Sequence, residues 1–131
     1  MATALVLGGA SLTQLTPSAH AASSELSLFG SATPAVTSDP DSAGVELGVR
    51  FRSDVPGAID GVRFYKGTGN TGTHTGSLWT SGGRRLARAT FTSETSTGWQ
   101  TVRFASPVPI AANTTYVASY YASRGHYAAD E

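Results

Sequence analysis

The sequence predicts an all-β protein, an antiparallel β-sandwich of the Ig-like or jelly-roll-like kind. Apolar and polar residues alternate along several short segments, as in Val45–Phe51, where every second side chain is apolar. Gly, Pro, Asn and Ser separate these segments at intervals of roughly 8 to 15 residues, which is typical of a sandwich. After Glu25, no segment shows a convincing helical period.

Length and composition fit one small domain with no charge-driven partner. The 131 residues leave room for a single core. Nine basic and nine acidic side chains cancel, so no charge excess favours nucleic acid or an anionic membrane as a partner. Cysteine is absent, which excludes a disulfide framework and a thiolate metal site. We expect no cofactor.

Residues 1–22 are predicted to be a secretory signal peptide. They carry no charge, Ala2–Leu15 is mostly small and apolar, and Ala19-His20-Ala21 matches a small-x-small cleavage site. A signal normally opens with Lys or Arg, and we attribute their absence to a start inside the true signal; the alternative is an N-terminal tail outside the fold. The stretch is too short and too polar for a membrane span. The protein is therefore expected to be secreted.

Residues 23–44 are predicted to be a loop-rich lead-in that begins with a short strand, Leu26–Phe29, and continues through Pro34 and Asp39-Pro40. The sandwich module is predicted over 45–131. Its strands are expected, in order, at Val45–Arg52, Ile59–Lys66, Ser77–Thr80, Leu86–Phe91, Trp99–Phe104 and Thr115–Tyr121.

Turn chemistry and alternation justify these strands. Asp54–Gly57 is a turn, and Ser81-Gly82-Gly83 joins the third and fourth strands as a hairpin. Pro107–Ile110 is predicted to be an edge segment, because proline cannot donate to a central ladder. Alternation directs the side chains of six residues into the core: Val49, Phe51, Val62, Phe64, Val102 and Phe104.

Four motifs carry a resemblance to a known family: VELGVRFRSDVPG (45–57), GVRFYKGTGNTGTHTGSLWTSGG (61–83), GWQTVRF (98–104) and TTYVASYYASRGHY (114–127). The chain resembles the bacterial family called domain of unknown function 4082, an exported module of actinobacterial and other multidomain surface proteins. The resemblance implies an Ig-like sandwich beside fibronectin-like, carbohydrate-binding or hydrolase domains, with no established activity to carry over. Family members continue past the GHY motif, so this chain is expected to lack its last strand or strands. Neighbouring domains, or a chain that supplies those strands, are expected partners.

Aromatic residues suggest a sugar-binding surface, because flat rings stack on the C–H faces of pyranoses while polar groups bind the hydroxyls. The rings of such a platform would come from Tyr65, Trp79, Tyr120 and Tyr121, with Asn70, His74 and Arg63 as polar neighbours. Of these, the candidate ligand-binding residues are Tyr65, Asn70, His74, Trp79 and Tyr121. The alternative is that these rings, and that of Trp99, fill the core or cover its rim.

Other motifs have simpler explanations. Gly67–Gly72 matches G-x-G-x-x-G, but a strand follows in place of the helix that a dinucleotide site needs. His74 and His126 lack acidic residues at ligand spacing, so no metal site is predicted. The nearby Arg84, Arg85, Arg88 and Arg103 suggest either a patch for an acidic wall polymer or solvated strand faces.

No catalytic motif is present: the chain has neither G-x-S-x-G nor H-E-x-x-H, and no spacing selects a carboxylate pair. The chain is therefore expected to be a non-catalytic extracellular accessory module that binds a polysaccharide or another cell-surface polymer weakly. The alternative is a structural spacer or adhesive protein-interaction module. A more remote alternative is part of a secreted hydrolase.

Overall fold

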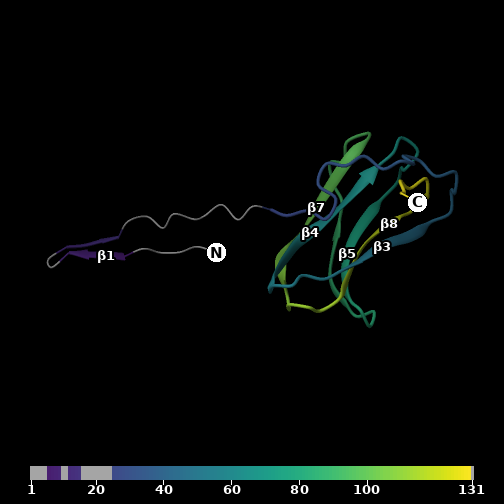
Figure 1. Cartoon of the computed structure of the whole chain (residues 1–131). Helices are drawn as coiled ribbons and strands as arrows, with labels where there is room; N and C mark the ends of the chain where they lie inside the picture. Colours follow the sequence, from purple (N-terminus) through teal and green to yellow (C-terminus); the bar gives the residue numbers. More distant parts are fainter. Residues whose placement is uncertain (1–5, 10–11, 16–24, 131) are drawn as a thin grey trace. The chain divides into compact units, whose positions relative to one another are not determined.

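The structure is a computed structural model that describes residues 6–9, 12–15 and 25–130 (Figure 1). The chain divides into two compact units, Met1–Ala32 and Thr33–Glu131. In the first unit, β1 (Val6–Gly9) and β2 (Leu12–Leu15) form an antiparallel pair. Much of the predicted signal peptide, 1–22, lies outside the described residues.

The short strand predicted over Leu26–Phe29 is wrong. This segment leads into a turn, in which the Ala32 N–H donates to the Phe29 carbonyl oxygen at 3.1 Å. Leu26 and Leu28 are exposed. Alternating apolar residues form a stable strand only when a neighbouring strand and a core receive them, and this segment pairs with no strand among the described residues.

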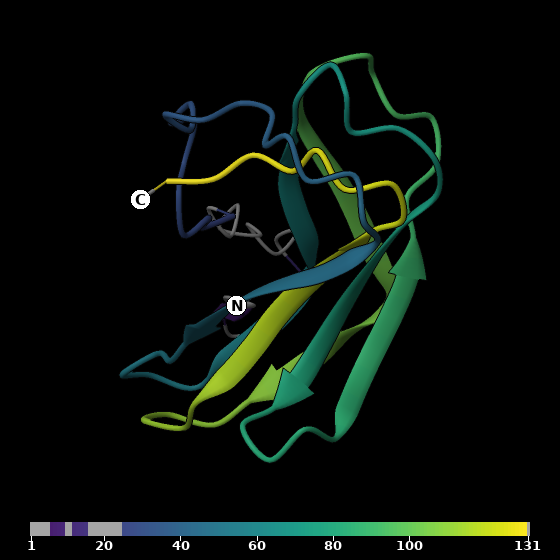
Figure 2. The ribbon, with the colours of Figure 1, turned by 90° about the vertical axis from the view of Figure 1, so that its right-hand side faces the viewer.

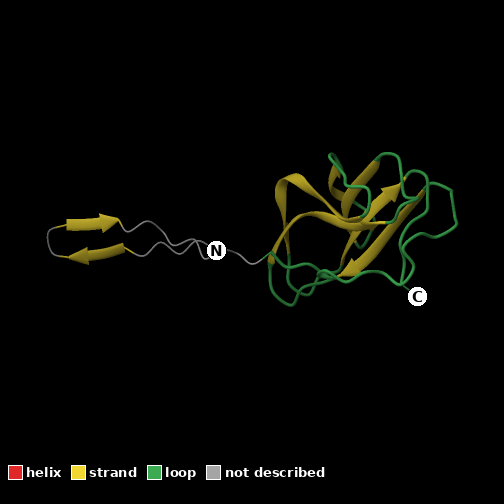
Figure 3. Ribbon diagram, turned by 90° about the horizontal axis from the view of Figure 1, so that it is seen from above, coloured by secondary structure: helices red, strands yellow, loops and turns green. Residues whose placement is uncertain are grey.

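The second unit is an antiparallel β-sandwich of two layers (Figure 2). The larger sheet has the order β3 (Val45–Phe51), β8 (Tyr116–Ala122), β5 (His74–Thr80) and β6 (Arg85–Thr90). The smaller sheet pairs β4 (Gly57–Lys66) with β7 (Gly98–Ile110). The described residues form strands and loops without a helix, which confirms the predicted all-β class (Figure 3).

The core lies between the two sheets. Its buried apolar residues are Val62, Phe64, Leu78, Phe91, Val102, Phe104, Ile110 and Tyr116. Of the residues that alternation directed inward, Val62, Phe64, Val102 and Phe104 are among them. Val49 and Phe51 are only half-buried, and Phe51 packs against the core from its edge. The Phe64 ring stacks on Tyr120, with centroids 4.3 Å apart, and meets Phe91 edge-on at 4.9 Å. Such offset and perpendicular contacts are the arrangements that aromatic rings prefer.

Two strands differ from their predicted limits by more than two residues. The predicted hairpin of β5 and β6 is confirmed, but β5 begins at His74, before the predicted start at Ser77. The segments predicted as Trp99–Phe104 and Pro107–Ile110 form one continuous strand, β7. The prolines fit there because β7 belongs to a two-stranded sheet and has a free edge.

The lead-in and the C-terminal tail lie side by side and close one end of the sandwich (Figure 2). Val36 and Ala129 form an antiparallel bridge. The Asp39 N–H donates to the Tyr127 carbonyl oxygen at 2.8 Å, and the His126 N–H donates to that of Asp41 at 2.7 Å. Backbone hydrogen bonds thus join the lead-in to the tail, although alternation predicted neither segment as a strand of the sandwich.

Candidate functional site

The outer surface of the four-stranded sheet collects the side chains that alternate away from the core. We call this surface the Trp79 face. Strand register places three rows of residues across it. These rows, in the order β3, β8, β5, β6, are Arg50–Val117–Trp79–Arg85, Gly48–Ser119–Ser77–Arg88 and Glu46–Tyr121–Thr75–Thr90.

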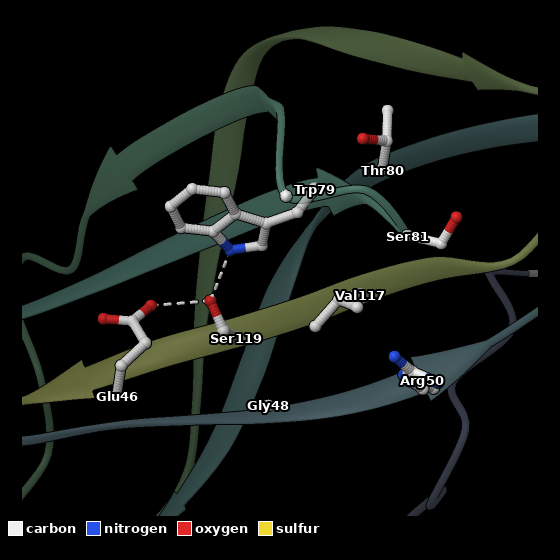
Figure 4. Close-up of a pocket in the computed structure, with 9 residues that line it drawn as sticks. Glu46, Gly48, Arg50, Trp79, Thr80, Ser81, Val117 and Ser119 are labelled. Atoms are coloured by element: carbon white, nitrogen blue, oxygen red, sulfur yellow. Dashed lines mark hydrogen bonds between the residues drawn. The ribbon is translucent and has the colours of Figure 1, made fainter.

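The Trp79 side chain is held in place by a chain of hydrogen bonds (Figure 4). Its indole Nε1–H donates to Ser119 Oγ at 2.7 Å, and the Ser119 hydroxyl donates to Glu46 Oε1 at 2.6 Å. Ser119 is 4% exposed, whereas Glu46 is exposed at the edge strand. The indole is therefore fixed before any ligand arrives, with its ring beside the sheet surface.

An open hollow of about 400 Å³ lies next to this ring. Its lining comes from three strands and the β5–β6 turn, and includes Glu46, Gly48, Arg50, Ser81 and Ser119 (Figure 4). Gly48 keeps the hollow open, because a Cβ at this position would lie 3.1 Å from Val117 Cγ1 and 3.2 Å from Ser119 Cβ. Charged, hydroxyl and aromatic groups thus border one shallow space.

Tyr121 and Trp79 both belong to the Trp79 face. Tyr121 is 38% exposed and stands opposite Glu46 in the ladder between β8 and β3. Tyr120, the next residue back along β8, faces the other way and stacks on Phe64 in the core. Two of the four rings predicted as a platform therefore share this surface.

Tyr65 lies on the other sheet, in β4, away from the Trp79 face. Its ring meets Trp99 of β7 edge-on, with centroids 5.7 Å apart. The Arg63 guanidinium lies over the Trp99 ring, 4.8 Å from its centroid. These three side chains pack on one another, so the structure does not bring Tyr65 and Trp79 into one platform.

Asn70 and His74 are both fully buried and are held in an internal polar network. His74 Nδ1 lies 2.9 and 3.0 Å from the two Glu94 carboxylate oxygens, and its Nε2 lies 2.8 Å from Asn70 Oδ1. Lys66 Nζ lies 3.1 Å from Glu94 Oε1. Two of the three predicted polar neighbours of a sugar, Asn70 and His74, are therefore bound to other side chains inside the fold, where they link the β4–β5 and β6–β7 loops.

Tyr120 completes this network on its apolar side. The Asn70 amide Nδ2 donates to the Tyr120 hydroxyl at 3.4 Å. Burial raises the pKa of Tyr120 to about 12, and the Asn70 hydrogen bond lowers this pKa by a smaller amount. This partly buried hydroxyl thus stays protonated above the usual pH range of tyrosine ionisation.

Sequence reasoning missed Glu46, Arg50 and Ser119 as members of the site. Alternation along the first strand of the sandwich already pointed Glu46 and Arg50 away from the core. It could not show that Ser119 and Trp79, which lie 73 and 33 positions further along the chain than Glu46, would be their neighbours. Only the strand order β3–β8–β5 provides that information.

The described residues contain neither a metal-binding cluster nor a membrane-spanning helix. No group of three His, Cys, Asp or Glu side chains lies close enough there to hold a metal ion. That same part of the chain contains no helix long and apolar enough to cross a membrane.

Comparison with known proteins gives one match. The family model described as Domain of unknown function (DUF4082) matches residues 31–131, which include the whole sandwich. No curated protein and no solved structure matches the chain.

Proposed function

Because the chain belongs to this family of unknown function, we propose a function from the geometry of the site: a non-catalytic extracellular module that binds a glycan on the Trp79 face. The observation that carries the proposal is the fixed indole of Trp79 beside the open hollow. A pyranose that lies against such a ring buries its C–H face on an aromatic surface. Its hydroxyls then face the polar groups around the hollow.

Preorganisation favours binding at this place. Ser119 and Glu46 already hold the indole, so little side-chain freedom remains to be lost when a ligand arrives. Oxygen acceptors and hydroxyl groups lie within the same hollow, at Glu46, Thr80 and Ser81. An aromatic ring with a few convergent polar groups is the usual composition of a small-ligand site.

The length and openness of the hollow also suit a segment of a polymeric ligand. Glu46 and Arg50 border it and lie four residues apart on one strand, which corresponds to roughly 13 Å. The hollow is open, so a polymer can pass over it without an end entering a closed pocket. Weak binding to a long polysaccharide fits this shape better than capture of a small metabolite.

A second feature favours the alternative role in protein interaction. A separate groove of about 380 Å³ lies between β6 and β7, with apolar side chains from Leu86, Phe104 and Val108. Both of these strands have a free edge. An adhesive module would use this groove and would show concentration-dependent self-association that the variant Leu86→Ser weakens.

The glycan proposal is tested with the full chain and a panel of insoluble and soluble polysaccharides. We expect at least one polysaccharide to retard the protein in affinity electrophoresis, and Trp79→Ala to lower that affinity by at least tenfold. Trp99→Ala is the matched control, because it removes the other tryptophan, on the opposite sheet. Equal binding by Trp79→Ala and the parent chain, with both folded by circular dichroism, would exclude the proposed site.

A further inference from the structure

Most charged side chains on the Trp79 face are positive, although the whole chain has no net charge. The charged side chains in its three rows are Glu46, Arg50, Arg85 and Arg88. Three positive groups therefore face one negative group. All three arginines are exposed to solvent.

The arginines are not neutralised by the ion pairs seen elsewhere in the sandwich. Lys66 pairs with the carboxylate of Glu94 in the buried network, and Arg103 lies 3.7 Å from Asp60 on the opposite sheet. On the Trp79 face, by contrast, Arg88 Nη2 donates to the Thr75 hydroxyl at 3.4 Å. The Arg85 guanidinium lies 5.8 Å from the centroid of the Trp79 ring. Within the part of the chain that the structure describes, no carboxylate forms an ion pair with Arg50, Arg85 or Arg88.

The charge of the three rows also changes along the strands, from positive in the row of Trp79 to negative in the row of Glu46. The row that contains Trp79 begins with Arg50 and ends with Arg85, so one arginine stands on each side of the indole. Three steps of strand spacing separate the two backbones, or roughly 14 Å. The next row has one arginine, and the last row has Glu46 at its β3 end. The face therefore has a positive end at Trp79 and a negative corner at Glu46.

From this arrangement we infer that the ligand of the Trp79 face is an anionic glycan, whose carboxylate or phosphate groups are bound by Arg50 and Arg85 while a sugar ring lies against Trp79. Planar guanidinium groups bind carboxylate and phosphate through paired N–H donors. Glu46 accepts hydroxyl groups at the other end of the hollow and repels a second anion there. This inference rests on the proposed function and names its ligand class.

The test uses the full chain and three soluble polymers: a polyuronate, a glucosylated poly(glycerol phosphate) and a neutral glucan. We expect one of the two anionic polymers to bind at least tenfold more tightly than the glucan, with an affinity that falls as salt is raised. The double variant Arg50→Gln/Arg85→Gln should lose at least tenfold of that affinity. Arg103→Gln is the matched control, because it removes an exposed arginine from the other sheet.

The outcomes separate the two proposals. Tighter binding of the polyuronate identifies a sugar carboxylate, and tighter binding of the glucosylated poly(glycerol phosphate) identifies a phosphate; either supports the inference if Trp79→Ala also weakens that binding. If the neutral glucan binds as tightly as the anionic polymers and Trp79→Ala weakens that binding, the inference of an anionic ligand is wrong. The proposed glycan site on the Trp79 face is then still supported. Binding that needs the arginines but not Trp79 would overturn both, as would no binding to any of the three polymers.

Discussion

Tyr120 contributes both to the aromatic core of the sandwich and to its internal polar network. Its ring stacks on Phe64 in the core, and its hydroxyl receives the hydrogen bond from Asn70. Through Asn70 it is connected to His74 and Glu94. A partly buried hydroxyl of this kind stabilises the fold only while it is protonated, because the phenolate would lose part of its hydration.

We therefore predict that Tyr120 makes the fold sensitive to alkali. Its pKa in the folded chain, about 12, exceeds the ordinary value of 10, so the folded state holds the proton more tightly. The stabilisation is fully present below about pH 10 and is lost as the pH rises through about 12. It amounts to at most roughly 2 to 3 kcal/mol, since one unit of pKa corresponds to about 1.4 kcal/mol.

The variant Tyr120→Phe tests this prediction. Near pH 8 it should cost about 1 kcal/mol through the lost hydrogen bond with Asn70. Between about pH 9 and pH 12, its free energy of unfolding in urea should fall less steeply than that of the parent chain. Parallel curves for the two proteins over this range would contradict the assignment of the alkaline sensitivity to Tyr120.

Within strand β4, one glycine allows the backbone of the partner strand β7 to approach closely. The register between β4 and β7 is irregular between Ile59 and Gly61: Ile59 pairs with Val108 and Gly61 with Arg103, so two steps along β4 correspond to five along β7. A Cβ on Gly61 would overlap the carbonyl oxygen of Val102 on the partner strand. Gly57, in the same strand, has open space where its Cβ would be. The two positions therefore differ in what a methyl group would meet.

We predict that Gly61→Ala lowers the free energy of unfolding by about 3 kcal/mol, because the β4 and β7 backbones must move apart. Gly57→Ala should change it by no more than about 0.5 kcal/mol. Urea denaturation followed by tryptophan fluorescence measures both. If the two variants unfolded at the same urea concentration, the close approach of Gly61 to Val102 would be wrong.

Alternation predicted the strands of the sandwich well and the site poorly, for one physical reason. A period of two reports which side of its own strand each residue occupies, and Val62, Phe64, Val102 and Phe104 accordingly lie in the core. It carries no information on which strand is the neighbour. The contacts of Trp79 with Ser119 and of Ser119 with Glu46 depend on that pairing. The burial of Asn70 and His74 likewise depends on loops whose paths no local pattern sets.

In the whole molecule, the core residues found in the described part of the chain all lie in the unit Thr33–Glu131. We predict that a chain beginning at Thr33 folds and unfolds at the same urea concentration as the full chain. A chain beginning at Val45 should be less stable by about 2 kcal/mol, because the tail then loses its backbone partners at Val36, Asp39 and Asp41.

Circular dichroism and urea denaturation of the two shortened chains measure this difference. The chain that begins at Thr33 serves as the control for shortening as such. Equal stability of the two would show that the lead-in 33–44 contributes nothing to the fold, despite its pairing with the tail.

The pairing of β3 with β8 has a mechanical consequence. These are the first and last strands of the sandwich, and they run antiparallel with Val45 opposite Ala122. Tension applied at these two positions pulls from the same end of the ladder, across the strands and along the hydrogen bonds. The bonds then break one after another, as in unzipping, and not all at once, as in shear. A sandwich with this strand order yields at low force when it is stretched between those two points.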